Sequence, residues 1–456
     1  MRHCQTPSTS KASPKGVLVA SALLCLSFAA NAMDLLQAYE AAQKNDATIL
    51  AARATALAER ERLPQARSQF LPNINASLSH NNNRLKSVTP NFRGEEQTTN
   101  TRYPSSNQTL TLRQPLYRPQ LAAQYRQAEA LVNDAEATLT QEEQNLAVRV
   151  SGAYFEAMLT HDQLALILAQ QTAYVSQLDA ARKSLAAGSG TRTDIDEAQA
   201  RLDMSRALEI EGRQNVVYTL QQLQTLVGEP IDKLSTLNVA QLVLANPQPD
   251  SLQDWVARAE LNSPQLQSLR ARVEVARQEI KKVQAGHKPT LDAIAQWSNS
   301  ESESITNTSS SYTNKSVGFQ LNVPLFAGGY VNSQVRQALA GLERVEQLLE
   351  AGRRDLGLRV HKEFRGVTEN IPKIGALEQA LKSSDQLVLS SRKSFQAGSR
   401  TVLDILNAEQ QRVVVSRDLA QARYMYLISK VRLLALVGDI DQATLVAVNQ
   451  ALTERK

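Results

Sequence analysis

The sequence contains one helical unit twice, at a spacing of 210 residues. The segment RKSLAAGSGTRTDI, which begins at Arg182, returns as RKSFQAGSRTVLDI from Arg392. The same shift aligns Leu226–Gly228 with Leu436–Gly438. A repeat of this length predicts that the chain folds as two copies of one structural unit. Two helical copies in one chain favour a symmetric, elongated molecule over a compact enzyme.

The first 32 residues have the pattern of a secretory signal peptide. Two lysines precede an apolar stretch at 17–30, which ends in the small-residue cleavage site Ala30–Ala32. Both cysteines of the chain, Cys4 and Cys25, lie in this segment. We therefore expect the exported protein to have no disulfide, no thiolate metal site and no cysteine for lipid attachment.

The charge of the expected mature chain is nearly balanced. The sequence has 50 Lys and Arg against 45 Asp and Glu, and three of the basic residues lie in the signal segment. The remaining net charge of about +2 does not indicate a nucleic-acid partner. After residue 32 the sequence has no uninterrupted apolar run of about 18 residues, so a helical membrane span is not expected.

The distribution of proline predicts very long helices. Proline is absent between Pro119 and Pro230, between Pro324 and Pro372, and after Pro372. Because a proline in a helix interior costs about 3 kcal/mol, these gaps permit long helices over about 119–228 and about 330–437. The apolar positions in both stretches have coiled-coil spacing, which predicts helices packed side by side. These positions include Leu139, Leu146 and Val150, with the shifted partners Leu349, Leu356 and Val360.

Each copy also carries a pair of strand-like segments ahead of its long helices. In the second copy Val317, Phe319 and Leu321 alternate with polar residues. This period of two predicts a strand with one apolar and one polar face. We expect β-hairpins over about 70–117 and about 289–326, each with a long polar loop.

These segments give the expected domain organisation. A first repeat at 33–245 is followed by a linker at 246–249, whose sequence is Asn-Pro-Gln-Pro. A second repeat then covers 250–440, and a C-terminal tail covers 441–456. The predicted fold is therefore mixed but mainly α, a tandem repeat of long coiled-coil helices with two inserted β-hairpins.

Four strands are too few to close a membrane barrel. A transmembrane strand needs about 9–11 residues of alternating polarity, which these segments provide. An open sheet edge in lipid leaves unpaired backbone groups, and the smallest bacterial barrels have about eight strands. If these strands span a membrane, several chains must each contribute four. The alternative is a small soluble sheet with one packed face.

The chain resembles the TolC-like outer membrane efflux proteins over essentially its whole expected mature length. The resemblance rests on the duplicated unit, on LLQAYEAAQKND, RQPLYRPQLAAQYRQAEA and VPLFAGGYVNSQVRQALA, and on two AGS-containing turns. It implies a homotrimer with a shared 12-stranded outer membrane β-barrel and a periplasmic α-helical tunnel. It also implies a passive exit duct for efflux or type I secretion, which docks on an inner membrane pump through a periplasmic adaptor.

The two turns are the candidate functional segments. Glycine suits the left-handed position after a helix end, and Thr191 and Thr401 are predicted N-caps with an acid three residues later. The resemblance implies that the turns dock on the adaptor. The docking residues would be Gly188, Ser189, Gly398 and Ser399.

The resemblance also assigns roles to charged residues beside the second turn. Asp404 matches an acid that forms a ring around the pore entrance, and Arg400 matches a basic residue that pairs with Asp194 of a neighbouring subunit as a latch. The simpler interpretations are a helix-capping acid and a solvated loop charge. This chain departs from the family where Asn407 replaces a second acid and Phe395 replaces a tyrosine. Both departures favour a weaker entrance.

Two classes of function compete at this stage. The first is an outer membrane exit duct, and the second is a periplasmic coiled-coil adaptor with a small β domain. Two symmetric hairpins of amphipathic strands favour the duct. The sequence has no nucleophile–base arrangement, P-loop or histidine cluster with metal-ligand spacing, so we expect no enzyme activity and no cofactor.

Overall fold

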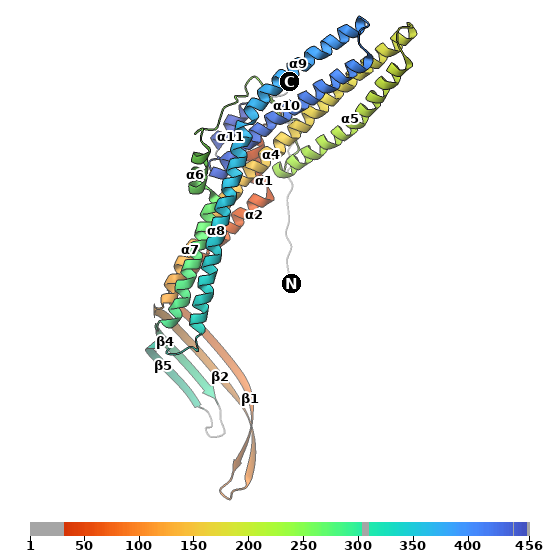
Figure 1. The fold of residues 1–456 in the computed structure, drawn as a ribbon. Coiled ribbons are helices and arrows are strands. Elements are labelled where there is room, and N and C mark those ends of the chain that lie inside the picture. The colour runs from red at the N-terminus through yellow and green to blue at the C-terminus, as the bar shows by residue number, and fades with distance from the viewer. Residues whose placement is uncertain (1–31, 303–309, 441, 454–456) are drawn as a thin grey trace, which may run out of the picture.

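The computed structural model describes residues 32–302, 310–440 and 442–453. The molecule is elongated, with a strand region at one end and two helical hairpins whose turns lie at the other (Figure 1). Its longest helix, α4 (Pro119–Ala186), is about 100 Å long at a rise of 1.5 Å per residue. The predicted signal peptide lies, apart from Ala32, outside the described residues.

The two copies place equivalent helices on either side of each hairpin of strands. In the first copy the helices are α1 (Leu35–Asn45), α2 (Ala47–Arg60), α3 (Arg62–Ser68), α4 and α5 (Arg192–Val227). In the second copy they are α6 (Leu252–Asn262), α7 (Pro264–Gln284), the 3-10 turn η1 (Ala285–His287), α8 (Tyr330–Thr368), α9 (Asn370–Gln396) and α10 (Val402–Val437). Helices α4 and α5 form one antiparallel hairpin, and α9 and α10 form the other (Figure 1).

One difference between the two copies is that the long helix of the second copy is interrupted. Helix α8 ends at Thr368 and α9 begins at Asn370, whereas α4 continues without a break through the equivalent position. Pro372 lies in the first turn of α9, where the first copy has Asp162. Proline has no backbone N–H for the carbonyl four residues earlier, and its ring crowds that carbonyl. The repeated unit is therefore not identical in its backbone.

The strands of the two copies form one antiparallel sheet. Its strands are β1 (Asn73–Pro90), β2 (Glu96–Tyr117), β4 (Thr290–Ser302) and β5 (Ser310–Asn322). They lie in the order β1-β2-β4-β5, so the two hairpins join through β2 and β4. Strands β1 and β5 are the edges of this sheet within the chain.

The segment expected as a C-terminal tail is partly folded. It contains α11 (Gln442–Asn449) and β6 (Leu452–Thr453), and β6 pairs with β3 (Thr236–Leu237) near the end of the first repeat. Leu445 of α11 is fully buried in the main core. This segment therefore packs against the main core and is not an extended tail.

The main core lies where helices of both copies meet around the middle of the molecule. The predicted coiled-coil positions Leu146 and Val150 of α4 and Leu356 and Val360 of α8 are buried in it. Tyr154 is also fully buried, and its hydroxyl donates to the backbone oxygen of Met33 at 3.0 Å. Burial strongly raises the pKa of Tyr154, so this hydroxyl stays protonated. The seams predicted from heptad spacing therefore hold the two copies together.

Within the described residues, no helix is both long enough and apolar enough to cross a membrane.

Candidate functional site: the two-faced sheet and the helical turns

The strand register gathers apolar side chains on one face of the sheet. Residues directly opposite each other in neighbouring antiparallel strands point to the same face. One such row across the sheet is Ile74, Leu112, Ala295 and Val317. Because side chains alternate along each strand, Leu78, Phe319 and Leu321 lie on this face too, with Val317 88 % exposed. The chain itself leaves this apolar face uncovered.

The opposite face of the same sheet is largely polar. The adjacent row is Asn75, Thr111, Gln296 and Ser316. The alternation predicted for the second copy therefore extends over all the strands of the sheet. A sheet with one apolar and one polar face, and with both faces exposed, fits a wall between lipid and water.

A salt bridge fixes the sheet to the helices. Asp292 near the start of β4 is buried, with 5 % of its side chain exposed, and accepts a hydrogen bond from Arg118 Nε at 2.7 Å and a second one from Arg118 Nη2. Arg118 directly precedes α4 and so joins the strand region to the longest helix. Arg113 of β2 adds a weaker contact with Asp292 at 3.3 Å. No sequence motif indicated this contact, because its partners are 174 residues apart.

The two helical turns have the same backbone geometry. Gly188 and Gly398 have φ values of +75° and +73°, which are the left-handed conformation that glycine adopts readily. The backbone N–H of Ser189 donates to Ser184 O at 3.0 Å, and that of Ser399 donates to Ser394 O at 2.9 Å. These bonds complete the ends of α4 and α9 as Schellman-type caps. Two turns with matching backbone geometry are thus exposed at one end of the molecule.

Both predicted capping boxes are present beyond the turns. Thr191 caps α5, and Asp194 Oδ2 accepts from the Thr191 backbone N–H at 3.0 Å. Thr401 caps α10, and Asp404 Oδ2 accepts from the Thr401 backbone N–H at 2.9 Å. Within the chain, both acids therefore serve as helix caps, as the simpler interpretation expected.

The Asp404 cap is expected to weaken in acid. The Thr401 backbone N–H lowers the pKa of Asp404 below its ordinary value of 3.8, with help from the Thr401 hydroxyl. Because the folded-state pKa is the lower one, the cap stabilises α10 fully above pH 3.8 and is lost as the pH falls through the lowered value. Hydrogen exchange at 402–405, corrected for intrinsic rates, should accelerate in that range. Asp404→Asn should remove this pH dependence; an unchanged profile in that variant would contradict the assignment.

A small apolar cluster packs the two helical hairpins together near the turns. It contains Tyr174, Leu178, Ala198, Leu202, Val402 and Leu406, with Ile195 and Phe395 packed against it. Phe395, which replaces the family's tyrosine, therefore contributes apolar packing here. The turns are thus held by a core of their own, separate from the main core.

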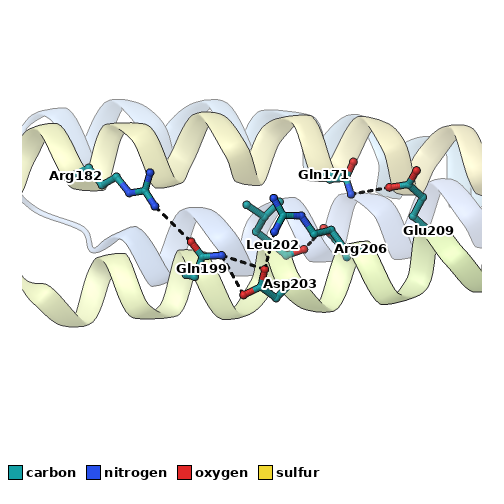
Figure 2. Close-up of polar contacts among 8 residues, drawn as sticks. Gln171, Arg182, Gln199, Leu202, Asp203, Arg206 and Glu209 are labelled. Carbon is teal, nitrogen blue, oxygen red and sulfur yellow. Dashed lines mark hydrogen bonds and ion pairs between the residues drawn. The ribbon is translucent and has the colours of Figure 1, made fainter.

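Polar side chains connect α4 and α5 along the same hairpin (Figure 2). Gln171 of α4 donates to Glu209 of α5 at 2.8 Å, and Arg182 donates to Gln199 at 3.5 Å. Gln199 also donates to both oxygens of Asp203 at 3.0 Å. These exposed contacts are individually weak. The Gln171–Glu209 and Arg182–Gln199 contacts thus add polar links between α4 and α5.

The charged residues beside the second turn are placed differently from one another. Arg400 donates to Ser391 Oγ at 3.4 Å, and the structure does not bring it to Asp194 within one chain. Asn407 accepts from Arg201 of α5 at 3.1 Å. Glu409 is the acid of α10 that lies two residues beyond Asn407, but it is only 4 % exposed and pairs with Arg392 at 2.6 Å. Glu409 therefore joins α9 to α10 and does not replace the acid.

Comparisons with known proteins agree with this architecture. The chain matches the family described as outer membrane efflux protein over residues 38–229 and 255–439. The solved Campylobacter jejuni CmeC outer membrane channel has the same fold, with a TM-score of 0.74 and 14 % identity over 91 % of this chain and 89 % of that chain. The two-faced sheet and paired helical hairpins thus define the fold of an outer membrane channel.

Two relatives are similar over nearly their whole length. The proteases secretion protein PrtF of Dickeya chrysanthemi is 32 % identical over 94 % of this chain and 93 % of its own. The alkaline protease secretion protein AprF of Pseudomonas aeruginosa is 34 % identical over 93 % of this chain and 88 % of its own. The chain belongs to the outer membrane efflux protein family.

Membership of this family decides between the alternatives left by the sequence. The chain is an outer membrane channel protein, so the prediction of an exit duct is confirmed and the periplasmic adaptor alternative is wrong. A family of channel proteins also places it outside the enzymes. In the described part of the chain, no group of three or more His, Cys, Asp or Glu is placed to hold a metal ion.

Proposed function

We propose that this chain is the exit duct of a tripartite type I secretion system, and that it conducts proteins passively from an inner membrane pump to the exterior. The cargo class is inferred from PrtF and AprF, which are named as protease secretion proteins and exceed 30 % identity over nearly the whole chain. The duct itself supplies no energy, because export would be driven by the pump.

The observation that carries this proposal is the sheet with two exposed faces and two open edges. In the part of the chain that the structure describes, β1 and β5 have no neighbouring strand on their outer sides, and lipid does not tolerate open edges. Three chains with four strands each would close a 12-stranded barrel by pairing β1 of one chain with β5 of the next. The apolar face would then contact outer membrane lipid, and the helical hairpins would form a periplasmic tunnel.

The turns at the far end of the helices are proposed to dock on the periplasmic adaptor. At Gly188 and Gly398 an added Cβ would meet nothing within 4 Å, so the surface there is open to a partner. Gly188→Glu combined with Gly398→Glu should lower secretion at least tenfold, measured as exported protein in the culture medium. Gly188→Asn combined with Gly398→Asn is the matched control, since asparagine tolerates the left-handed conformation.

The outcome of this experiment separates docking from folding. The glutamate variant is expected to form the same trimer in the outer membrane as the wild type but to lose secretion. Wild-type levels of both protein secretion and drug resistance would reject the turns as the docking site. A loss of drug resistance with normal protein secretion would reject the type I cargo and favour small-molecule efflux.

The tunnel entrance is proposed to close through Arg400 and the Asp194 of a neighbouring subunit. Asp404 would contribute the acid ring, since its Oδ1 has no partner among the described residues while Oδ2 forms the cap. Three carboxylates converging on a narrow axis would favour cations. With Asn407 bound to Arg201, one acid ring remains at this level of the tunnel.

Removing the latch should open the entrance. Arg400→Ser is expected to raise single-channel conductance in planar bilayers several-fold, because three symmetric contacts are lost together. Arg206→Ser is the control, since Arg206 pairs with Asp203 within α5 at 3.0 Å. Equal conductance in Arg400→Ser and the wild type would show that Arg400 is a solvated loop charge.

A further inference from the structure

The β1–β2 hairpin extends well beyond the other strands at the end away from the helices (Figure 1). The last pair between β2 and β4 joins Ser105 to Ser302. Among the described residues, the hairpin from 82 to 104 is therefore paired only with itself. Its turn is ordered by Asn91, whose side-chain Oδ1 accepts from the backbone N–H groups of Arg93 and Glu95 at 2.8 and 3.1 Å. The hairpin is therefore an ordered projection from the sheet, with paired strands and a hydrogen-bonded turn.

Three cations share one face of this projection. Arg84 and Arg102 are direct cross-strand partners, and Lys86 lies two residues from Arg84 on the same side. All three are exposed, and none has a hydrogen bond or ion pair in the described part of the chain. The opposite face, which carries residues such as Asn83, Leu85 and Thr101, has no charged residue between 81 and 89 or between 97 and 105. We call Arg84, Lys86 and Arg102 the basic face.

The basic face continues the apolar face of the sheet. Ile74, Ala76 and Leu78 lie on the same side of β1 as Arg84 and Lys86, because all of them are separated by even numbers of residues. Trp297 and Lys315 are cross-strand partners on this side, and such residues suit the boundary between lipid and water. The apolar face of the sheet therefore becomes basic along β1 towards the end of the hairpin.

The distance of the basic face from the apolar part of the sheet limits which lipids can contact it. Arg84 is six residues beyond Leu78, which is about 20 Å along a strand and about 15 Å of height at a typical barrel tilt. The headgroup layer of an ordinary phospholipid is only about 5–8 Å thick on each side. A lipid that reaches Arg84 must therefore carry a larger anionic headgroup, such as a chain of phosphorylated sugars.

We propose that the basic face binds the phosphorylated sugar headgroup of a glycolipid in the outer leaflet. The proposal rests on the membrane orientation given under Proposed function. Two arginines directly opposite each other repel, and an anion between them would turn this repulsion into a bidentate contact, since guanidinium groups match phosphate geometry. The binding would anchor the projecting hairpin against the membrane and fix the duct at a defined depth.

The test compares two lipids that differ only in the sugars above the acyl chains. The mature protein is reconstituted in neutral-lipid nanodiscs, and binding is titrated with lipopolysaccharide that carries phosphorylated core sugars and with lipid A, which lacks them. The wild type is expected to prefer the longer glycolipid. Arg84→Gln combined with Arg102→Gln should weaken that binding on the order of tenfold. In the wild type, 0.5 M salt should weaken binding similarly, because the Debye length falls to about 4 Å.

The control is Arg93→Gln, which removes one positive charge from the hairpin turn beside Phe92 but leaves the basic face intact. Equal binding by the double variant and the wild type would overturn the proposal, as would an equal loss in Arg93→Gln. Hydrogen exchange at 81–105 in neutral detergent checks folding separately, because relief of the arginine repulsion should increase protection. A wild type that fails to insert into nanodiscs would reject the proposed function, whereas insertion without a preference for the longer glycolipid would reject only this inference.

Discussion

Val317→Arg is expected to prevent stable insertion of the sheet into the outer membrane. Val317 lies on the apolar face of the edge strand β5, 88 % exposed, in the row that crosses all four strands of the sheet. Arginine on the lipid-facing side of a barrel costs about 2–4 kcal/mol at the bilayer midplane and less towards the interfaces. Because Val317 lies two residues from Lys315, we expect about 1–2 kcal/mol for each chain, an equilibrium factor of about 5–30. In a trimer the change occurs three times. The fraction of the protein that co-floats with phospholipid vesicles after refolding measures the effect.

Ser316→Arg is the matched control for that experiment. Ser316 is the neighbouring residue of β5 and lies in the polar row with Gln296. Arginine there would face the water-filled side of the proposed barrel, so insertion should remain close to the wild-type level. If both variants inserted equally well, the apolar face would not be the lipid-facing side, and the proposed barrel would be wrong.

Asp292→Ala is expected to destabilise the junction between the strands and the helices. Asp292 is buried and accepts two hydrogen bonds from Arg118, which is itself only 24 % exposed. Removing the carboxylate leaves the partly buried guanidinium of Arg118 without its partner. We expect a loss of about 2–3 kcal/mol in the free energy of unfolding. This is less than for a fully buried ion pair, because Arg118 keeps some contact with water. The midpoint of thermal unfolding in neutral detergent should fall accordingly.

Arg113→Gln serves as the control for the junction. Arg113 contacts the same carboxylate at 3.3 Å, but 46 % of its side chain is exposed, so its loss should change stability by less than about 1 kcal/mol. Asp292→Asn should lie between the two, since the amide oxygen still accepts one bond. Equal unfolding midpoints for Asp292→Ala and Arg113→Gln would show that Arg118 does not hold the junction.

The elements predicted from the sequence are those with a local physical signal. Proline-free, heptad-spaced stretches correspond to α4 and α8, because helix formation and apolar periodicity are both local. Alternation predicted the strands, and glycine followed by a capping threonine predicted the turns around Gly188 and Gly398. The break before α9 was not predicted, although Pro372 was its visible signal.

The sequence by itself determined the repeat, because similar segments can be compared directly at any spacing. It also determined the long helices, the amphipathic strands and the capped turns, because each of these depends on residues a few positions apart. Only the tertiary structure decided the contacts between distant segments. These include the pairing of β2 with β4, the Asp292–Arg118 junction and the burial of Glu409. It also placed Arg84 and Arg102 on the side that carries the apolar rows, since strand register sets the face of every side chain.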